Sequence, residues 1–125
     1  MLSGMTILVV EDEPLVAMMV EDMLADLGCI VVGPAMQLAE GLRLAETAEF
    51  DAAVLDVNLN GGRSFPIADM LKDRGIPFLF ATGYGGGEAL EGRQDPVIQK
   101  PYQMERLAEM LTAITSRDRG RTATL

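Results

Sequence analysis

Side chains that bind metal ions and phosphoryl groups follow four short apolar runs of this sequence. Each stands where a run ends, and together they are Glu11, Asp12, Asp56, Thr82 and Lys100. If the runs are neighbouring parallel strands, their carboxyl ends meet at one edge of a sheet, where such sheets bind ligands. Carboxylates are ligands that Mg²⁺ prefers, and an ammonium group pairs with phosphoryl oxygens. The sequence therefore predicts one site for a divalent cation and a phosphoryl group.

Asp12 and Asp56 are the carboxylates that we expect to bind the cation. Two carboxylates and a main-chain carbonyl suffice for Mg²⁺, which keeps several waters, and the loop after Asp56 brings the carbonyl of Asn58 within reach. Asp56 is also the candidate nucleophile, since a carboxylate can form an aspartyl-phosphate. Each has a simpler interpretation: an acidic turn at a helix N-terminus for Glu11-Asp12-Glu13, and a turn aspartate for Asp56. Only their combination favours the metal site.

Thr82 and Lys100 are expected to contact the phosphoryl group. The Thr82 hydroxyl would donate a hydrogen bond to a phosphoryl oxygen, and Gly83 leaves room for the group to enter. The Lys100 ammonium would pair with Asp56 in the empty site and with phosphoryl oxygens in the filled one. Taken singly, Thr82 is an ordinary β-branched strand residue and Lys100 an ordinary surface lysine. The bond before Pro101 is a candidate cis peptide, because X–Pro bonds tolerate the cis form at low cost.

Strand patterns alternate with helix patterns along the chain, which indicates a mostly parallel sheet with helices on both faces. The strands are predicted at residues 6–10, 30–34, 51–56, 76–82 and 96–99, and the helices at 14–27, 37–48, 64–74 and 103–115. Ser64 is the expected N-cap of the third helix, and Gly28 and Gly75 are expected to end the first and third. The glycine-rich stretch 83–94 predicts at most a short helix around 88–91, and the tail after residue 117 predicts disorder.

The composition narrows the class of protein. A chain of 125 residues predicts one domain. A net charge of −9 argues against binding to nucleic acid or to anionic membranes. Histidine is absent, which excludes a histidine base and a typical zinc site. The lone Cys29 fits a small buried hydrophobe in a reducing cytosol. Apolar runs of about 18 residues and signal-peptide features are both missing, so we expect a cytoplasmic protein without a membrane anchor.

With these residues in place, the sequence resembles the receiver domain of two-component response regulators over residues 5–117, leaving 118–125 as a tail. The resemblance implies an α/β, flavodoxin-like, doubly wound five-stranded parallel sheet in the order 2-1-3-4-5. It also implies the following roles: an acidic pair at Glu11 and Asp12, with Glu11 acting on Mg²⁺ through a water; the phosphoacceptor at Asp56; a metal-binding main-chain oxygen at Asn58; the hydroxyl at Thr82; and the lysine at Lys100, followed by a cis-proline at Pro101.

The sequence departs from the family at the position of its switch aromatic, which is Val97 here. The string from Phe80 to Tyr84 is similar to that of a subgroup of stand-alone receivers. In this subgroup Tyr84 is a candidate for part of the switching role, so the switch candidates are Thr82, Tyr84, Val97 and Pro101.

The resemblance implies a phosphohistidine donor, either a histidine kinase or a histidine phosphotransfer protein. It also implies an unknown downstream protein that binds the face built from residues 83–110, and no turnover beyond self-phosphorylation and self-dephosphorylation. Three alternatives remain: a Mg²⁺-dependent phosphohydrolase with an aspartyl nucleophile, a pseudo-receiver that only binds partners, and a piece of a longer hybrid kinase. Asn58 counts against the hydrolase, because that mechanism places a carboxylic acid at this position.

Overall fold

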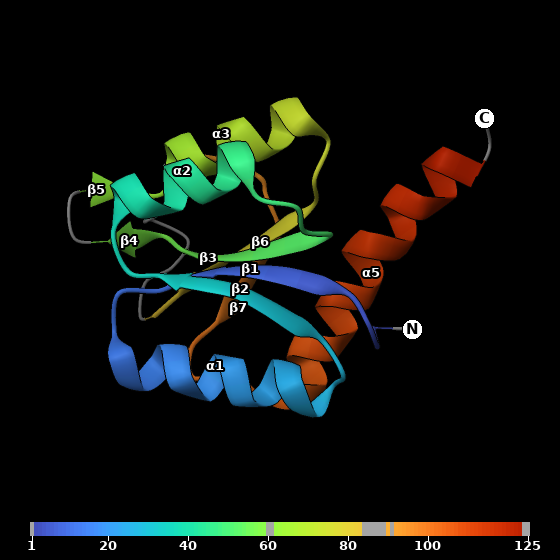
Figure 1. Ribbon diagram of the computed structural model, residues 1–125, viewed down its shortest axis with the longest axis horizontal. Coiled ribbons are helices and arrows are strands. Elements are labelled where there is room, and N and C mark those ends of the chain that lie inside the picture. The colour runs from blue at the N-terminus through green and yellow to red at the C-terminus, as the bar shows by residue number, and fades with distance from the viewer. Residues whose placement is uncertain (1, 60–61, 84–89, 91, 124–125) are drawn as a thin grey trace.

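Five parallel strands form the central sheet of the computed structural model, in the order β2-β1-β3-β6-β7 (Figure 1). The structure describes residues 2–59, 62–83, 90 and 92–123, with side chains up to residue 116. The strands are β1 Thr6–Val10, β2 Ile30–Ala35, β3 Ala52–Asp56, β6 Phe78–Thr82 and β7 Val97–Gln99. In order of appearance along the chain this is the predicted 2-1-3-4-5 arrangement, so the flavodoxin-like fold is confirmed.

Two layers of helices cover the sheet. One face carries α1 and α5, and the other carries α2 and α3 (Figure 1). The helices are α1 Pro14–Asp26, α2 Leu38–Thr47, α3 Phe65–Arg74 and α5 Met104–Ala123. Strand β1 shows why both faces need cover: Ile7 and Val9 enter the core under α1 and α5, while Leu8 and Val10 enter the core under α2 and α3. All four are buried, as continuous apolar strands are in doubly covered parallel sheets.

The strand register brings the four predicted segments to one edge. Val10 of β1 lies opposite Leu55 of β3, Asp56 opposite Ala81 of β6, and Thr82 opposite Gln99 of β7. The residues that follow these pairs are therefore neighbours at the carboxyl edge of the sheet. This edge faces left in Figure 1, beside the short hairpin of β4 and β5.

Several boundaries differ from the predicted ones, and two differences have a clear cause. Strand β6 begins at Phe78 rather than at residue 76, since Pro77 has no amide hydrogen for a strand ladder and only its carbonyl is bonded, by the N–H of Ala53. Helix α5 continues to Ala123, past the predicted end at residue 115 and through most of the tail predicted to be disordered. Its added residues include three arginines, which are good helix formers. Residues 124 and 125 lie outside the described residues.

Local features follow the sequence in part. Gly75 ends α3 in the left-handed conformation (φ 72°), and Gly28 follows α1 at φ 85°, as predicted. The peptide bond Lys100–Pro101 is cis, which confirms that prediction, and Gly33–Pro34 is cis as well. Ser64 precedes α3 but makes no side-chain capping hydrogen bond. The short helix expected around 88–91 lies almost wholly outside the described residues. Within the described part of the chain, no helix is both long and apolar enough to span a bilayer.

A short antiparallel hairpin, β4 Asn58–Leu59 with β5 Gly62–Arg63, was not predicted. It follows Asp56 directly and places Asn58 at the start of β4. The N–H of Ser64 then donates to the carbonyl of Val57 at 2.9 Å, which closes the loop and begins α3 beside the end of β3. The hairpin therefore fixes the chain on the C-terminal side of the candidate nucleophile.

Candidate functional site

Glu11 and Asp12 enter the site from the end of β1. The N–H of Glu11 donates to the carbonyl of Ala35 at 2.9 Å, which extends the sheet past the last residue of the strand. The Glu11 side chain is buried, and its Oε2 accepts a hydrogen bond from the N–H of Glu13 at 3.1 Å. Asp12 is half-buried. Helix α1 then starts at Pro14, whose fixed φ suits a first helical residue.

Asp56 ends β3 and faces these two residues. Its side chain is buried, and one carboxylate oxygen from each of Glu11, Asp12 and Asp56 lies within 4.8 Å of the others. The central position of β3, between β1 and β6, explains the convergence. The predicted juxtaposition of Asp12 and Asp56 is present.

Lys100 enters the site from the end of β7, the strand at the other edge of β6 from β3. Its N–H donates to the carbonyl of Thr82 at 2.7 Å, directly after β7. Its Nζ lies 2.8 Å from Oε1 of Glu11 and 3.3 Å from Oδ1 of Asp56. The pairing with Asp56 was predicted, but the shorter contact with Glu11 was not. The ammonium thus bridges the two buried carboxylates.

Burial and charge strongly perturb these groups. Burial and the neighbouring Glu11 carboxylate raise the pKa of Asp56 from 3.8 to about 7, and Lys100 only partly opposes this rise. Burial alone would lower the pKa of Lys100, but Glu11 and Asp56 raise it overall. Tyr102, buried beneath the site, has a pKa raised by burial and by the same two carboxylates. The site therefore carries more negative charge than one ammonium neutralises.

The donor set fits a magnesium ion. Three carboxylate oxygens in close reach are hard ligands of the kind that Mg²⁺ takes, with its remaining positions left for waters. Oε1 of Glu11 is buried and accepts no well-aligned hydrogen bond from the described residues, although it forms the ion pair with Lys100. Buried polar atoms are normally hydrogen-bonded, so this oxygen is available to a further partner. A cation would also offset the repulsion by Glu11, which adds to burial in raising the pKa of Asp56.

Thr82 ends β6 at the same edge and is buried. Its hydroxyl donates to the carbonyl of Gly83 at 3.4 Å, a long hydrogen bond that is easily exchanged for a better acceptor. The hydroxyl is thus able to turn toward a group on Asp56. Gly83 itself is exposed and has no heavy atom of the described residues near the place of a Cβ, as the prediction of an open entrance requires.

The remaining predicted site residues have mixed outcomes. Asn58 follows Asp56 at the start of β4 with an exposed side chain, and its role as a main-chain ligand stays a prediction. Val97, which the resemblance places at the family's switch position, is half-buried against the core that contains Phe80. Pro101 is exposed beside Lys100. Tyr84 lies outside the described residues. The sequence carried no signal for the pairing of Lys100 with Glu11 or for the buried Tyr102.

Comparison with known proteins agrees with this geometry. The family model for the response regulator receiver domain matches residues 7–112. Among curated proteins, the phyllosphere-induced regulator PhyR of Methylorubrum extorquens is 32% identical over 111 residues, which are 85% of this chain and 42% of that protein. The two-component response regulator PhoP of Pseudomonas aeruginosa is 31% identical, covering 93% of this chain and 54% of PhoP. The chain thus spans about half, or less, of these relatives.

Solved structures show the same fold. SdrG from Sphingomonas melonis Fr1 superposes with a TM-score of 0.79 at 46% identity, covering 91% of this chain and 98% of SdrG. PhyR from Brucella abortus gives a TM-score of 0.84 at 25% identity, covering 97% of this chain and 51% of PhyR. The receiver domain of the sensor histidine kinase PA1611 from Pseudomonas aeruginosa, with magnesium in its active-site cleft, gives 0.80 at 24% identity and covers 91% and 99%.

Proposed function

This chain belongs to the family of response regulator receiver domains, and on that basis we propose that it accepts a phosphoryl group on Asp56 from a phosphohistidine protein. The observation that carries the proposal is the placement of Asp56 beside Glu11, with the Lys100 ammonium bridging the two carboxylates and Asp12 within reach of the same point. A lone carboxylate in a turn would need none of these partners.

The reaction is a transfer between two side chains. An oxygen of Asp56 attacks phosphorus in line and forms an O–P bond, while the P–N bond of the phosphohistidine breaks and its electron pair stays on the imidazole. Lys100 neutralises charge on the transferred oxygens, and Thr82 donates a hydrogen bond to one of them. Asp12, Asp56 and the main-chain oxygen of Asn58 would hold Mg²⁺, with Glu11 acting through a water. When bound, the cation supplies charge neutralisation to the phosphoryl oxygens.

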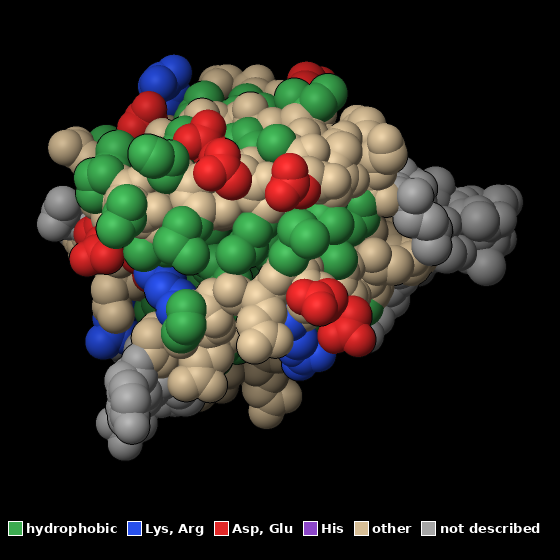
Figure 2. Space-filling model, turned by 90° about the horizontal axis from the view of Figure 1, so that it is seen from below, with side chains coloured by type: hydrophobic (Ala, Val, Ile, Leu, Met, Phe, Trp, Pro, Cys, Tyr) green, Lys and Arg blue, Asp and Glu red, His purple; other side chains and the backbone are tan. Residues whose placement is uncertain are grey.

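The donor protein docks on α1, next to the site. Leu15, Met18 and Met19 are 71%, 54% and 42% exposed although they are apolar. Figure 2 shows the face of the molecule that α1 covers, where apolar side chains gather in a band between acidic ones. Exposed apolar patches rimmed by charge are typical of protein interfaces. Because α1 starts just after Asp12, a helix of the donor that packs on these three side chains brings its phosphohistidine close to Asp56.

The experiment that tests the phosphoacceptor is labelling with acetyl phosphate and Mg²⁺, followed by mass spectrometry of the intact protein. The wild type is expected to gain one phosphoryl group, which Asp56→Asn does not gain. Asp51→Asn is the matched control, because Asp51 stands just before the start of the same strand but is exposed and accepts a hydrogen bond from the N–H of Thr6. The control is expected to label like the wild type.

Each of three other outcomes would favour a different function or a different phosphoacceptor. Equal labelling of the wild type and Asp56→Asn would overturn the assignment of Asp56. A folded wild type that neither labels nor binds Mg²⁺ would be a pseudo-receiver that only binds partners. Continuous release of phosphate from small phosphate esters would identify a phosphohydrolase instead of a switch.

A further inference from the structure

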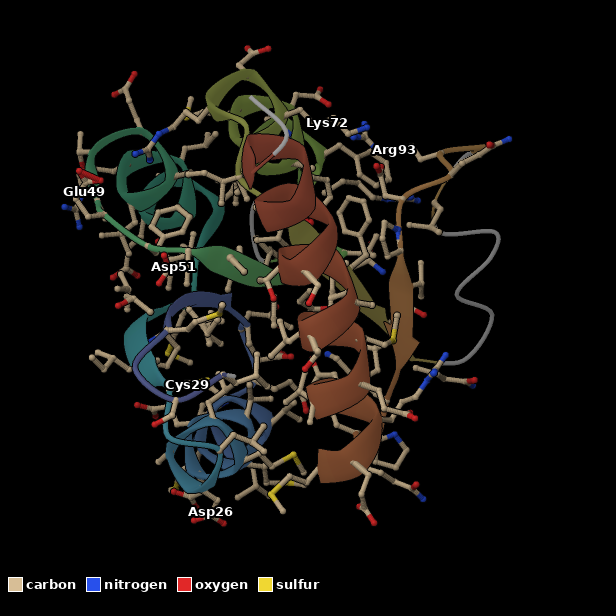
Figure 3. All side chains as sticks on the ribbon, turned by 90° about the vertical axis from the view of Figure 1, so that its right-hand side faces the viewer. Asp26, Cys29, Glu49, Asp51, Lys72 and Arg93 are labelled. Atoms are coloured by element: carbon tan, nitrogen blue, oxygen red, sulfur yellow. The ribbon has the colours of Figure 1, made fainter. Side chains whose placement is uncertain are left out.

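Arg93 stands at the centre of a cluster that ties the chain before β7 to helix α3. Its Nε donates to Oδ2 of Asp95 at 2.9 Å, and its Nη2 donates to Oδ1 of Asp69 at 3.0 Å. Lys72 completes the cluster with its Nζ 2.8 Å from Oδ1 of Asp95. Figure 3 shows Lys72 and Arg93 at the same corner of the molecule, one from α3 and the other from the connection that leads to β7.

The guanidinium of Arg93 also lies over two aromatic rings. Its central carbon is 5.0 Å from the ring centre of Phe65 and 5.6 Å from that of Phe80. These two rings meet edge to face, with centres 5.7 Å apart. A cation over an aromatic face is attracted by the ring, and more strongly when both are shielded from water. We call these two rings and the four charged residues Arg93, Asp95, Asp69 and Lys72 the Arg93 clasp.

The clasp is more than a pair of surface ion pairs. Side chains of Arg93 and Asp95 are only 21% and 10% exposed. Burial would raise the pKa of Asp95, but the hydrogen bonds from Lys72 and Arg93 lower it overall, so this carboxylate stays ionised. Partly buried, charge-assisted hydrogen bonds in a network are stronger than isolated surface pairs. The clasp therefore holds the strap, residues 92–96, firmly against α3.

Both rings of the clasp belong to elements that reach the proposed phosphorylation site, because β6 ends there and α3 begins beside it. Phe80 and Thr82 lie on the same face of β6, because side chains alternate along a strand. Phe65 is the first residue of α3 and follows Ser64, whose N–H bonds the carbonyl next to Asp56. A movement of Thr82 toward Asp56 therefore acts on one ring, and a change in the loop after Asp56 acts on the other.

The usual aromatic switch residue of the family is replaced by Val97 in this chain. Val97 is paired with Phe80 across β6 and β7 and is half-buried against the core that contains this ring. The rings that the guanidinium of Arg93 covers are those of Phe65 and Phe80, and Phe80 lies two residues before Thr82 on the same strand.

We propose that Arg93 is the positioning residue that couples the phosphoryl site to the strap. The clasp holds the strap in the unphosphorylated protein, and a phosphoryl group on Asp56 weakens this hold by drawing Thr82, and with it Phe80, toward the site. The effect of a phosphoryl group on the clasp rests on the proposed function, whereas the clasp itself does not. Coupling between two sites is reciprocal, so a weaker clasp must also favour the phosphoryl-bound form.

The test compares Arg93→Gln with Arg74→Gln. Arg74 is the matched control, because it also lies over a phenylalanine ring (Phe50, 5.5 Å) and also bonds another element, the carbonyls of Ala45 and Ala48 at the end of α2. It contacts neither the strap nor the site in the described part of the chain. Amide hydrogen exchange is measured at residues 92–95 of the strap, because Pro96 has no amide hydrogen. These include the Arg93 amide that donates to the carbonyl of Leu90, and the measurement is made with and without beryllofluoride and Mg²⁺ as the phosphoryl mimic.

In the wild type, beryllofluoride is expected to speed exchange in the strap. Without the mimic, exchange in the strap of Arg93→Gln is expected to be about tenfold faster than in the wild type, because the charge-assisted hydrogen bonds are lost. Adding beryllofluoride is expected to speed exchange in this variant only a little further. The affinity for beryllofluoride is expected to increase about fivefold, at the lower end of allosteric couplings. Arg74→Gln is expected to lower thermal stability but to match the wild type in both measurements.

Unchanged strap exchange in Arg93→Gln without the mimic would overturn the clasp. Faster exchange with an unchanged beryllofluoride affinity would leave a structural clasp and overturn the coupling. If Arg93→Gln does not fold, Arg93→Lys replaces it, because lysine keeps the charge but loses the planar fork and the stacking. A wild type that binds no beryllofluoride would refute the proposed function, while exchange without the mimic still decides whether the clasp exists.

Discussion

Lys100 lies closer to Glu11 than to Asp56, with its Nζ 2.8 Å from Oε1 of the first and 3.3 Å from Oδ1 of the second. The buried Glu11 carboxylate therefore takes the larger share of the ammonium. Burial of Asp56 and, after it, the incompletely neutralised Glu11 carboxylate raise the pKa of Asp56 to about 7. Glu11 thus contributes, after burial, to the raised pKa of the candidate nucleophile, in addition to the metal-binding role proposed for it.

Replacing Glu11 by glutamine tests this role. In Glu11→Gln the pKa of Asp56 is expected to fall, because the repelling charge is gone and Lys100 is free to approach Asp56. The affinity for Mg²⁺ is expected to fall about tenfold, as for other residues that act on a metal through its outer shell. Carboxyl ¹³C NMR reads the pKa, and calorimetric titration with MgCl₂ reads the affinity.

Glu13→Gln is the control for that experiment. Glu13 is exposed, and its main-chain N–H donates a hydrogen bond to Glu11. The substitution therefore removes the same charge from the same turn but leaves the three clustered carboxylates in place. Equal effects of the two variants on the affinity for Mg²⁺ would show that Glu11 contributes only to the overall charge.

Lys100→Met is expected to destabilise the protein strongly when Mg²⁺ is absent. The change leaves two buried carboxylates without a counter-charge, and the free energy of unfolding is expected to fall by about 3 kcal/mol, near the lower end for a broken buried ion pair. The loss is expected to stay near this lower end, because Asp56 takes up a proton and so leaves only one uncompensated buried charge. Adding Mg²⁺ is expected to restore much of the stability, as measured by urea unfolding.

The comparison for Lys100 is Arg106→Met. Arg106 also pairs with a carboxylate, that of Glu109 at 3.6 Å, but the two side chains are 60% and 70% exposed, so a loss below about 1 kcal/mol is expected. A similar loss in both variants, or a loss in Lys100→Met that Mg²⁺ does not reduce, would contradict the structural account of the site.

The raised pKa of Asp56 predicts how stability depends on pH in the metal-free protein. Its folded-state value of about 7 exceeds the ordinary 3.8, so between these limits the folded state binds more protons than the unfolded state. The free energy of unfolding therefore falls as pH rises through this range. The stabilising contribution is complete below the unfolded pKa and is lost above the folded one.

Urea unfolding of the wild type and Asp56→Asn in EDTA isolates this contribution from other titrating groups. The variant is expected to gain stability relative to the wild type as the pH rises from about 4 to about 7, since asparagine has no proton to lose. Saturating Mg²⁺ is expected to reduce the difference. A stability difference that does not change with pH would show that Asp56 has an ordinary pKa.

The convergence of the site was predictable because it depends on topology. Alternating strand and helix patterns force right-handed crossovers, and a parallel sheet then gathers the ends of its strands at one edge. No contact between side chains is needed for that argument. It placed Asp12, Asp56 and Lys100 correctly from their positions alone.

The remaining features depend on side-chain reach or on a loop path, which strand patterns do not encode. The preference of Lys100 for Glu11 depends on the extra methylene of glutamate and on burial. The Arg93 clasp depends on how the connection after β6 returns to α3. The β4–β5 hairpin did leave a signal, because Asn60-Gly61, the residues between its strands, is the dipeptide most typical of a two-residue hairpin. Its strands are too short to show the alternation by which strands are recognised.

The exposed apolar surface of α1 gives a prediction about the phosphoryl donor. The test uses a phosphohistidine protein that phosphorylates the wild type. Met18→Glu is expected to slow phosphoryl transfer from this donor by about tenfold, because the substitution places a charge at the centre of a desolvated contact. Labelling by acetyl phosphate, which needs no docking, is expected to stay unchanged. Ile30→Glu is the control, since Ile30 is 58% exposed but lies at the opposite edge of the sheet, at the start of β2. If both variants slow the protein donor equally, or if Met18→Glu also slows acetyl phosphate, the donor does not dock on α1.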